Sequence, residues 1–231
     1  MRADQFVLGI HHLAAEDVEM TLEAYVKQYS NYPTSYTRSD LIMANTGSHG
    51  GGAGETTAAF GLDPLVSKGS GFSRGIEFSM QKKLSEIPCY GMVSASYSQT
   101  EFKALDGISR PSDFDQRFIL NIGGGYIIDQ TWEVSAKFRI YSGRPYTPLD
   151  DKGNPVEAQI NSARVDVNHQ LDLRLARRWS IAANIIETYV DIQNVYSRKP
   201  VDAPVFDART RRTAQLPSLG IVPTIGLAIQ L

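Results

Sequence analysis

Residues 132–140 alternate between apolar and polar side chains without interruption, and this alternation constrains the fold more than any other feature of the chain. The apolar positions are Trp132, Val134, Ala136, Phe138 and Ile140, and the polar ones are Glu133, Ser135, Lys137 and Arg139. Successive side chains of a strand point to opposite faces of a sheet, so this segment is predicted to be a β-strand with one apolar and one charged face. Whether protein or lipid covers the apolar face decides between a soluble sheet and a membrane barrel.

Segments of the same character recur along the whole chain, which predicts an all-β protein. Residues 11–25 could also be read as a helix, but their flanks alternate, and a polar turn near residue 15 favours two strands there. The predicted strands of about 10–15 residues are longer than the 5–6 residues typical of soluble sheets. They cover residues 4–14, 18–31, 71–84, 89–101, 115–128, 131–146, 166–177, 180–196 and 217–231.

The connections between these strands alternate strictly between short and long. The short turns are predicted at residues 14–17, 85–88, 129–130 and 177–178. The long polar connections are residues 31–70, 100–113, 147–164 and 197–217. Outer-membrane barrels have short periplasmic turns and long extracellular loops, whereas a soluble sandwich has no reason to sort its loops by length.

The distribution of aromatic and basic residues also favours lipid as the cover of the apolar face. Trp132 and Trp179 are each predicted to follow a short turn directly, where an interfacial aromatic girdle would lie. The apolar stripe of residues 76–80 ends in Arg74 on one side and Lys82 on the other, which suits side chains that snorkel toward two interfaces. We therefore predict an antiparallel up-and-down transmembrane β-barrel section of about nine long strands.

Composition excludes several other classes of protein. Hydrophobic residues make up 42% of the 231 residues, charged residues 21%, and the formal net charge is −2, so neither a disordered chain nor a nucleic-acid partner is expected. The single cysteine, Cys89, excludes an internal disulfide framework. No apolar run approaches the ~18 residues of a membrane helix, and the first residues lack the layout of a secretory signal.

The sequence offers little support for metal binding or catalysis. His11, His12 and Glu16 lie close together, but adjacent strand residues face opposite sides, so we interpret the two histidines as an interfacial polar pair and expect no metal. The glycines of residues 121–126 are not followed by the Lys-Ser/Thr of a phosphate loop, and they are expected to thin a strand for close approach or curvature. Residues 71–75 (GFSRG) match Gly-x-Ser-x-Gly, but they lie inside a predicted strand and form no strand-to-helix nucleophile elbow, so we expect neither enzymatic activity nor a cofactor.

Seven charged residues are predicted to point away from the apolar face, toward a lumen. Such side chains could contact a solute or a plug, or they could form a mutually paired, solvated lining. The seven are Glu133, Lys137, Arg139, Asp172, Arg174, Glu187 and Asp191.

Five segments, in their order and spacing, resemble the C-terminal part of a TonB-dependent outer-membrane receptor. They are GFSRGIEFSMQKKL, RFILNIGGGYII, WEVSAKFRIYSGRPYTPLD, LDLRLARRW and YVDIQNVYSRKP, followed by a terminal alternating strand. SGRPYTP (residues 142–148) and DIQNVYSRK (residues 191–199) are the more specific pieces. Residues 6–33 look like an upstream strand pair of the same barrel, so the resemblance covers nearly the whole chain.

The resemblance implies a location in the cell outer membrane and active uptake of a scarce nutrient, such as a siderophore, cobalamin or a glycan. In that family the TonB complex pulls on an N-terminal plug. This sequence shows no plug, TonB box or signal peptide, about nine strands against the 22 of plugged transporters, and Leu231 where the family usually ends in an aromatic residue. We therefore interpret residues 1–231 as a fragment or truncated chain of the barrel, not functional alone, whose N-terminal strands and plug are missing.

Two alternatives remain open at this point. The first is a soluble all-β ligand-binding module, lipocalin-like or sandwich-like, in which the apolar face is a core. The second is an outer-membrane enzyme of the phospholipase or protease kind, which would need a catalytic set that the sequence does not display.

Overall fold

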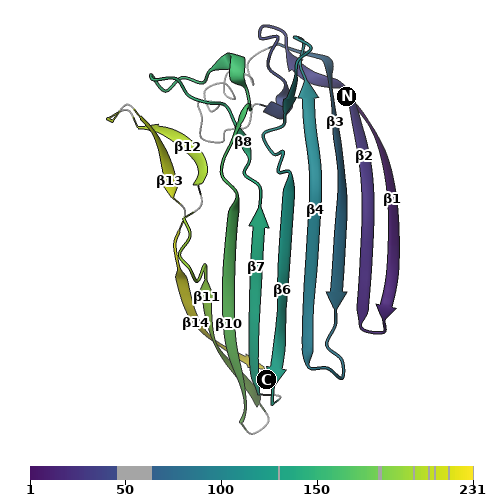
Figure 1. Cartoon of the computed structure of the whole chain (residues 1–231), viewed down its shortest axis with the longest axis vertical. Coiled ribbons are helices and arrows are strands. Elements are labelled where there is room, and N and C mark those ends of the chain that lie inside the picture. Colours follow the sequence, from purple (N-terminus) through teal and green to yellow (C-terminus); the bar gives the residue numbers. More distant parts are fainter. Residues whose placement is uncertain are drawn as a thin grey trace.

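Nine long strands stand side by side, each antiparallel to the next (Figure 1). The computed structural model describes residues 1–45, 64–129, 131–181, 184–199, 201–207, 209–210, 212–217 and 219–230. The long strands are β1 (Arg2–Ala15), β2 (Val18–Ser35), β3 (Leu65–Lys82), β4 (Cys89–Lys103), β6 (Phe118–Ile128), β7 (Trp132–Tyr141), β10 (Asn168–Ile181), β11 (Asn184–Gln193) and β14 (Val222–Gln230).

These strands form one sheet in the order β1-β2-β3-β4-β6-β7-β10-β11-β14, and the short strand β5 (Ser109–Pro111) pairs with β4. Each long strand pairs with the next one in the chain, so the predicted antiparallel up-and-down topology is confirmed. The long connections hold two small sheets, β8 (Pro145–Tyr146) with β9 (Ala163–Arg164) and β12 (Val201–Asp207) with β13 (Arg212–Pro217). Helix is confined in the described residues to the 3-10 turns η1 (Met43–Asn45) and η2 (Glu157–Gln159), and none of it is long and apolar enough to cross a membrane.

The connections are sorted by length, as the sequence indicates. Brief turns join β1 to β2, β3 to β4, β6 to β7 and β10 to β11 at what we call the short-turn end, and the long connections lie at the opposite, long-loop end (Figure 1). One predicted turn is wrong. Arg177 and Arg178 do not turn the chain but lie inside β10, in register with Thr188 and Glu187 of β11. The alternation of β10 continues through this pair, so the strand ends later, at Ile181.

The sheet has one apolar and one polar face. Residues directly opposite each other on neighbouring strands share a face, and the register places Leu22 opposite Phe78, Leu173 opposite Ala136, and Ile225 opposite Val190. This apolar face is uncovered in the described part of the chain: Phe6 is 74% exposed, Leu8 75% and Ile225 83%. Soluble proteins rarely expose a continuous apolar surface of this extent. The soluble-sandwich alternative requires a covered face and is not the fold observed.

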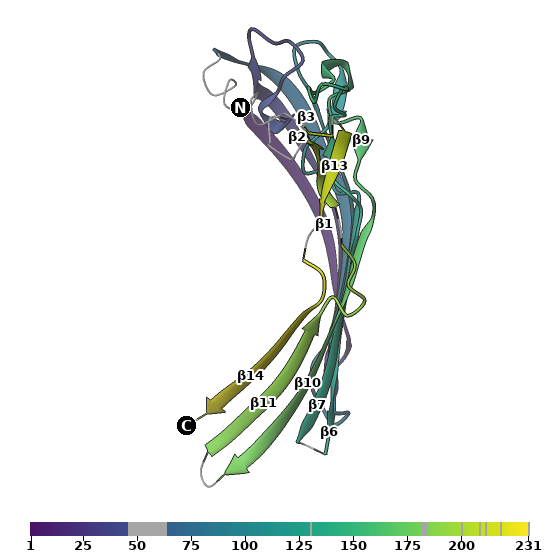
Figure 2. The same cartoon turned by 90° about the vertical axis from the view of Figure 1, so that its left-hand side faces the viewer.

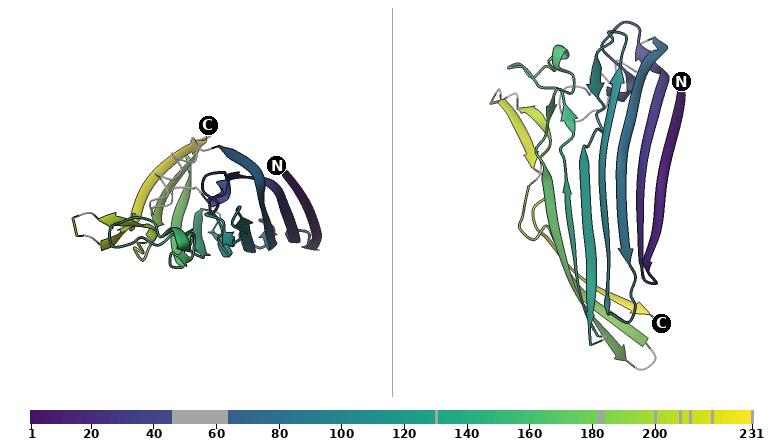
Figure 3. Two further views of the ribbon diagram at one scale, coloured as in Figure 1. Left: turned by 90° about the horizontal axis from the view of Figure 1, so that it is seen from above. Right: turned by 45° about the vertical axis from the view of Figure 1, so that its right-hand side comes forward.

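Buried apolar side chains gather instead at the long-loop end. Ile42, which directly precedes η1, is 1% exposed and packs with Phe102, which is 5% exposed, and with Tyr29. Gly71 makes room for this cluster, because a Cβ there would lie 2.3 Å from Phe102 Cδ1. Figure 2 shows the sheet as bowed, and in Figure 3, seen from above, the segment that contains Ile42 lies within the concave side. Tyr29 and Phe102 belong to the polar face, which is therefore the concave one.

Candidate functional site

All seven charged residues that were predicted to face a lumen lie on the polar face. The register places Lys137 of β7 opposite Asp172 of β10, and Arg174 of β10 opposite Asp191 of β11. The fold thus brings onto one surface side chains that are up to 58 positions apart in the sequence, from Glu133 to Asp191. These residues, which we call the wall residues, come from β7 (Glu133, Lys137, Arg139), β10 (Asp172, Arg174) and β11 (Glu187, Asp191).

Ion pairs join part of this wall across three strands. Arg178 Nη2 lies 2.9 Å from Glu133 Oε2, and Arg178 Nε lies 3.3 Å from Glu187 Oε2. Arg174 Nη2 lies 2.8 Å from the other oxygen of Glu187. Tyr90 of β4 donates its hydroxyl proton to Glu133 and extends the chain of contacts to a fourth strand. Two carboxylates and two guanidiniums therefore neutralise one another near the short-turn end, and we call these four residues the charged network.

Arg178 is the member of the network that sequence reasoning missed, because it was assigned to a turn. The signal was present: Asp172, Arg174 and Arg178 are separated by even numbers of residues, as side chains on one face of a strand must be. Tyr90 could not be recognised in this way, since its partner Glu133 lies 43 positions away.

Tyrosine rings lie over glycines of the neighbouring strand at three places on the polar face. A Cβ on Gly226 would lie 2.1 Å from Tyr189 Cζ, so the ring fits against β14 only because residue 226 has no side chain. The Arg174 guanidinium then lies 3.8 Å from the centre of this ring, in a cation–π contact. Gly125 gives Tyr90 the same close approach, which fits the expectation that the glycines of residues 121–126 thin a strand. The three pairs are Tyr25–Gly75, Tyr90–Gly125 and Tyr189–Gly226.

Four wall residues have no ion-pair partner among the residues that the structure describes: Lys137, Arg139, Asp172 and Asp191. The Arg139 guanidinium lies 5.6 Å from the centre of the Tyr141 ring. Asp172 is held differently, since it accepts hydrogen bonds from Gln170 Nε2 at 2.7 Å and from the backbone of Asn194 at 2.8 Å. Ion pairs therefore neutralise the wall residues near the short-turn end. Nearer the long-loop end, the charges of Lys137, Arg139 and Asp191 remain available to a solute.

A groove of about 310 Å³ lies on the polar face beside these charges. Glu23 and Glu77 face each other in register across β2 and β3, and no ion pair engages either of them within the described ranges. Besides the apolar residues Phe78, Ala95 and Ile119, hydroxyl and amide side chains of β2, β3, β4 and β6 line the rest: Thr21, Ser79, Ser94, Ser96 and Asn121. The groove offers acceptors on one side, while the cations of β7 lie on the other, so the surface can hold a hydrated polar solute.

The two tryptophans lie on the apolar face near the short-turn end. Trp132 is the first residue of β7, directly after a turn as predicted. Trp179 does not follow a turn, because β10 extends through it, and it lies opposite Ile186 instead. Its indole Nε1 donates to Thr188 Oγ1 at 3.0 Å, which fixes the ring on the sheet. Their role as an interfacial girdle remains a prediction.

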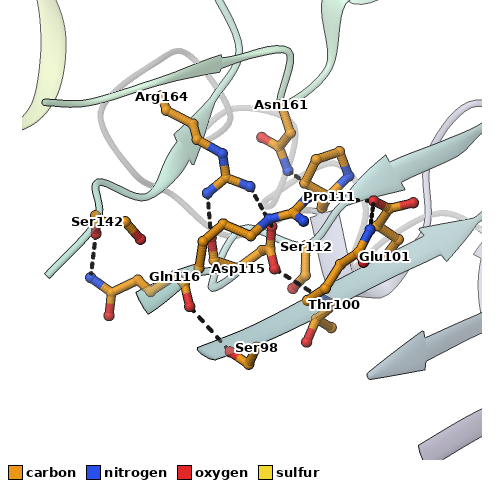
Figure 4. A network of polar contacts seen from close by, with 12 residues as sticks. Ser98, Thr100, Glu101, Pro111, Ser112, Asp115, Gln116, Ser142, Asn161 and Arg164 are labelled. Carbon is orange, nitrogen blue, oxygen red and sulfur yellow. Dashed lines mark hydrogen bonds and ion pairs between the residues drawn. The ribbon is translucent and has the colours of Figure 1, made fainter. Parts of the chain in front are cut away.

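At the long-loop end a buried carboxylate holds the loops together (Figure 4). The Asp115 side chain is 0% exposed and lies 2.7 Å from Arg117 Nε. Arg164 of β9 pairs with the same carboxylate and also donates to the backbone carbonyl of Asp115. The backbone amide of Thr100 donates to the carboxylate at 2.7 Å. Asp115 thereby joins the connection after β4 to the connection after β7.

The segment of residues 142–148 bends the chain at the end of β7. Gly143 passes against the backbone of the returning segment, where a Cβ would lie 1.8 Å from the carbonyl oxygen of Val165, so no other residue fits. The Ser142 carbonyl accepts from Gln116 Nε2 at 3.2 Å. This family-like segment is therefore a structural bend that positions Arg164 beside Asp115.

The segment of residues 191–199 ends β11 in a similar way around one asparagine. Asn194 is 5% exposed and has a φ of 55°, the left-handed region that asparagine tolerates well. Its Nδ2 donates to the Arg198 carbonyl at 2.7 Å, and its Oδ1 accepts from the Arg198 amide at 2.9 Å. Both of the more specific segments thus help to build the long-loop end.

Comparisons with known proteins place this architecture. No protein-family model matches the sequence, and no curated protein is significantly similar to it. Solved structures do match: the ferric-catecholate import receptor Fiu from Escherichia coli K12 has a TM-score of 0.67 at 12% identity over 98% of this chain and 27% of its own. The ferric citrate transporter FecA has a TM-score of 0.67 at 11% identity over 99% of this chain and 31% of its own. The ferric preacinetobactin receptor BauA from Acinetobacter baumannii has a TM-score of 0.64 at 17% identity over 98% of this chain and 29% of its own.

These likenesses establish the fold. The described strands have the architecture of part of the β-barrel of TonB-dependent outer-membrane receptors, as the sequence resemblance implies. The chain spans less than a third of the length of each of these three structures.

Proposed function

We propose that this chain forms part of the wall of a TonB-dependent outer-membrane receptor that imports a scarce nutrient. The observation that carries the proposal is the two-faced sheet: an uncovered apolar face, with Phe6 74% exposed, backs a concave face that bears ion pairs and unpaired charges. A membrane barrel needs this arrangement, with the apolar face toward lipid and the polar face toward a water-filled lumen.

The orientation in the membrane follows from loop length. Short turns lie on the periplasmic side of such barrels and long loops on the extracellular side. In the proposed receptor, the charged network lies toward the periplasm, and Asp115 with its partners Arg117 and Arg164 lies outside the cell. About 9–11 tilted strand residues cross a bilayer, so β2 and β3, with 18 residues each, project beyond it on the long-loop side.

Further strands complete the barrel in this proposal, and a plug connects it to the TonB complex. β1 and β14 each have one strand neighbour in the described sheet, so each presents an edge of unpaired backbone groups. A bilayer cannot satisfy such groups, and a closed barrel can. The chain is therefore proposed to be a C-terminal part of the barrel and to act in uptake only together with these partners, without an enzymatic activity of its own.

The proposed cargo is a nutrient of the siderophore, cobalamin or glycan class. The three matching structures are named for ferric catecholate, ferric citrate and ferric preacinetobactin, so a ferric chelate is the first cargo to test. A hydrated anionic chelate would find cations in Lys137 and Arg139, which have no ion-pair partner in the described part of the chain.

A spin-label scan of β7 tests where this face lies. In a Cys89→Ser background, single cysteines at Val134, Ser135, Lys137 and Phe138 carry the label, and the full chain is reconstituted in phospholipid vesicles. Labels at Val134 and Phe138 should collide with oxygen, which concentrates in hydrocarbon, and labels at Ser135 and Lys137 with a water-soluble nickel chelate.

A label at the exposed loop residue Asp151 provides the control, because it should meet only the water-soluble reagent. If Phe138 were closed to both reagents while its neighbours were wet, protein and not lipid would cover the apolar face, and the proposed function would fail.

A further inference from the structure

Arg177 places a guanidinium on the apolar face between the only two tryptophans of the chain. Its Cζ lies 3.7 Å from the centre of the Trp179 ring and 4.9 Å from that of the Trp132 ring. Both contacts are in the range in which a cation is attracted to the face of an indole. Trp179 is itself held by its hydrogen bond to Thr188, so the nearer of the two rings is fixed on the sheet.

The charge of Arg177 is not matched by any acidic side chain in the part of the chain that the structure describes. Its Nε is buried without a hydrogen-bond partner, and its two Nη atoms make no hydrogen bond to a described residue. Its neighbour Arg178, on the polar face, contrasts with it, because Glu133 and Glu187 engage that guanidinium. Since Nε is buried, the donors left for a partner are the two Nη atoms.

The position of Arg177 on β10 defines what such a partner can be. Leu173 and Leu175 precede it on the same face, 41% and 43% exposed, and the strand ends four residues later at Ile181. Arg177 therefore borders the apolar belt at the short-turn end, where a bilayer passes from hydrocarbon to headgroups. An accessible phosphate ester in this zone fits the planar fork of a guanidinium.

We infer that Trp132, Arg177 and Trp179 form a docking site for the phosphate of an anionic phospholipid in the leaflet at the short-turn end. The inference rests on the proposed function, since it requires the apolar face to lie in a bilayer. The guanidinium binds the phosphate, the indoles hold the guanidinium in place at the headgroup level, and the acyl chains lie along the leucines of β10. One cation near an anionic membrane surface contributes about 1 kcal/mol, which corresponds to roughly a fivefold preference over a zwitterionic lipid.

The tryptophans provide the measurement, because they are the only ones in the chain and both contact Arg177. The full chain is reconstituted in mixtures of phosphatidylethanolamine and phosphatidylglycerol in which one or the other lipid carries brominated acyl chains, which quench indole fluorescence. Quenching at a fixed mole fraction reports which lipid occupies the neighbourhood of the indoles. We expect brominated phosphatidylglycerol to occupy it about fivefold more favourably than brominated phosphatidylethanolamine.

Matched variants separate the charge from general surface effects. Arg177→Gln should bring the preference to about one, and Arg177→Lys should keep part of it, because the charge remains and the planar fork is lost. Arg74→Gln is the control, since Arg74 lies on the same face but is remote from both tryptophans and binds Gln99 instead. It should leave the preference unchanged.

The outcomes distinguish the site from the function on which it rests. Equal quenching by the two lipids in the unmodified chain, or an undiminished preference in an Arg177→Gln variant that brominated phosphatidylethanolamine still quenches, would overturn the docking site alone. If neither lipid quenched the unmodified chain, the tryptophans would lie outside lipid, and the site and the proposed function would both fail.

Discussion

The two ends of the sheet both use arginine–carboxylate pairs, but in opposite settings. At the long-loop end the Asp115 side chain is 0% exposed and joins segments that no strand pairing connects directly. In the charged network near the short-turn end, Arg178 is 43% exposed and joins β7, β10 and β11, which are already paired through their backbones. The same chemistry therefore defines the fold at one end and lines a surface at the other.

This difference teaches which pairs the structure depends on. Removal of one partner of a buried ion pair leaves groups that the pair had satisfied without their partner, which costs about 3–5 kcal/mol. A solvated pair costs only about 0–1 kcal/mol to remove. Loop order should accordingly depend on Asp115, whereas the wall should tolerate changes in its charges.

Replacement of Asp115 with asparagine should have the largest effect. The variant takes the charged acceptor from the Thr100 amide and from Arg117 and Arg164, which are 27% and 30% exposed, so we expect a loss of about 3 kcal/mol in the free energy of unfolding, at the lower end of that range. Urea titration in detergent micelles measures this loss, and limited proteolysis should show earlier cleavage in the long connections. Asp151→Asn, at an exposed position of the same end, is the matched control and should leave both readouts unchanged. A change below about 1 kcal/mol for Asp115→Asn would contradict the contrast between the two ends.

Removal of the charged network should have a smaller effect. We expect Arg178→Gln to lower the free energy of unfolding by about 0.5–1 kcal/mol, because the strands keep their backbone pairing, Arg174 still pairs with Glu187 and Tyr90 still donates to Glu133. A double-mutant cycle with Glu187→Gln isolates the coupling between the two side chains and should give less than about 1 kcal/mol. A coupling as large as the loss measured for Asp115→Asn would mean that the charged network stabilises the fold as strongly as the Asp115 ion pairs do. That result would contradict the contrast between the two ends.

The smallest effect should come from a pair at the very tip of the short-turn end. Asp17 accepts hydrogen bonds from Lys82 Nζ at 2.5 Å and Ser85 Oγ at 2.6 Å, and these bonds hold the pKa of the Asp17 carboxyl below its ordinary value of 3.8. A carboxyl whose pKa is lowered in the folded state stabilises the fold above its unfolded pKa and loses this contribution as the pH falls through its folded pKa.

The stability difference between the unmodified chain and Asp17→Asn should therefore be constant above about pH 5 and shrink toward zero in stronger acid. Parallel urea titrations between pH 2 and pH 7 measure it. A difference that grew on acidification would show that the pKa of Asp17 is raised. The hydrogen bonds from Lys82 and Ser85 to the Asp17 carboxylate would then not form.

The alternation of side chains was sufficient to predict the sheet but not its loops. Each of the nine long strands could be predicted because every second residue of a strand faces the same side of the sheet, as in residues 132–140. The error at Arg177 came from reading two adjacent arginines as a polar break, although one belongs to each face. Lys82 was interpreted as a snorkelling charge, and the structure shows a more specific partner for it in Asp17.

The long-loop end could not be predicted in the same way, because its contacts are not periodic. Asp115 and Arg164 are 49 positions apart, and no local pattern connects them. Nor does the sequence show why residues 142–148 and 191–199 were the more specific pieces of the family resemblance. In the structure these segments hold the close approach at Gly143 and the left-handed backbone of Asn194, which no local pattern reveals.

The unequal lengths of the strands give the proposed receptor a sloping rim. β2 has 18 residues and β11 has 10, a difference that corresponds to roughly 25 Å of strand at ~3.3 Å per residue. On the β1–β4 side, long continuous strands form the wall up to the long-loop end (Figure 1). Beyond the end of the shorter β11, the separate β12–β13 hairpin takes their place (Figure 1). A hairpin can be lengthened, shortened or exchanged without disturbing the strands beneath it, so the low side of the rim is where a new cargo preference could be grafted.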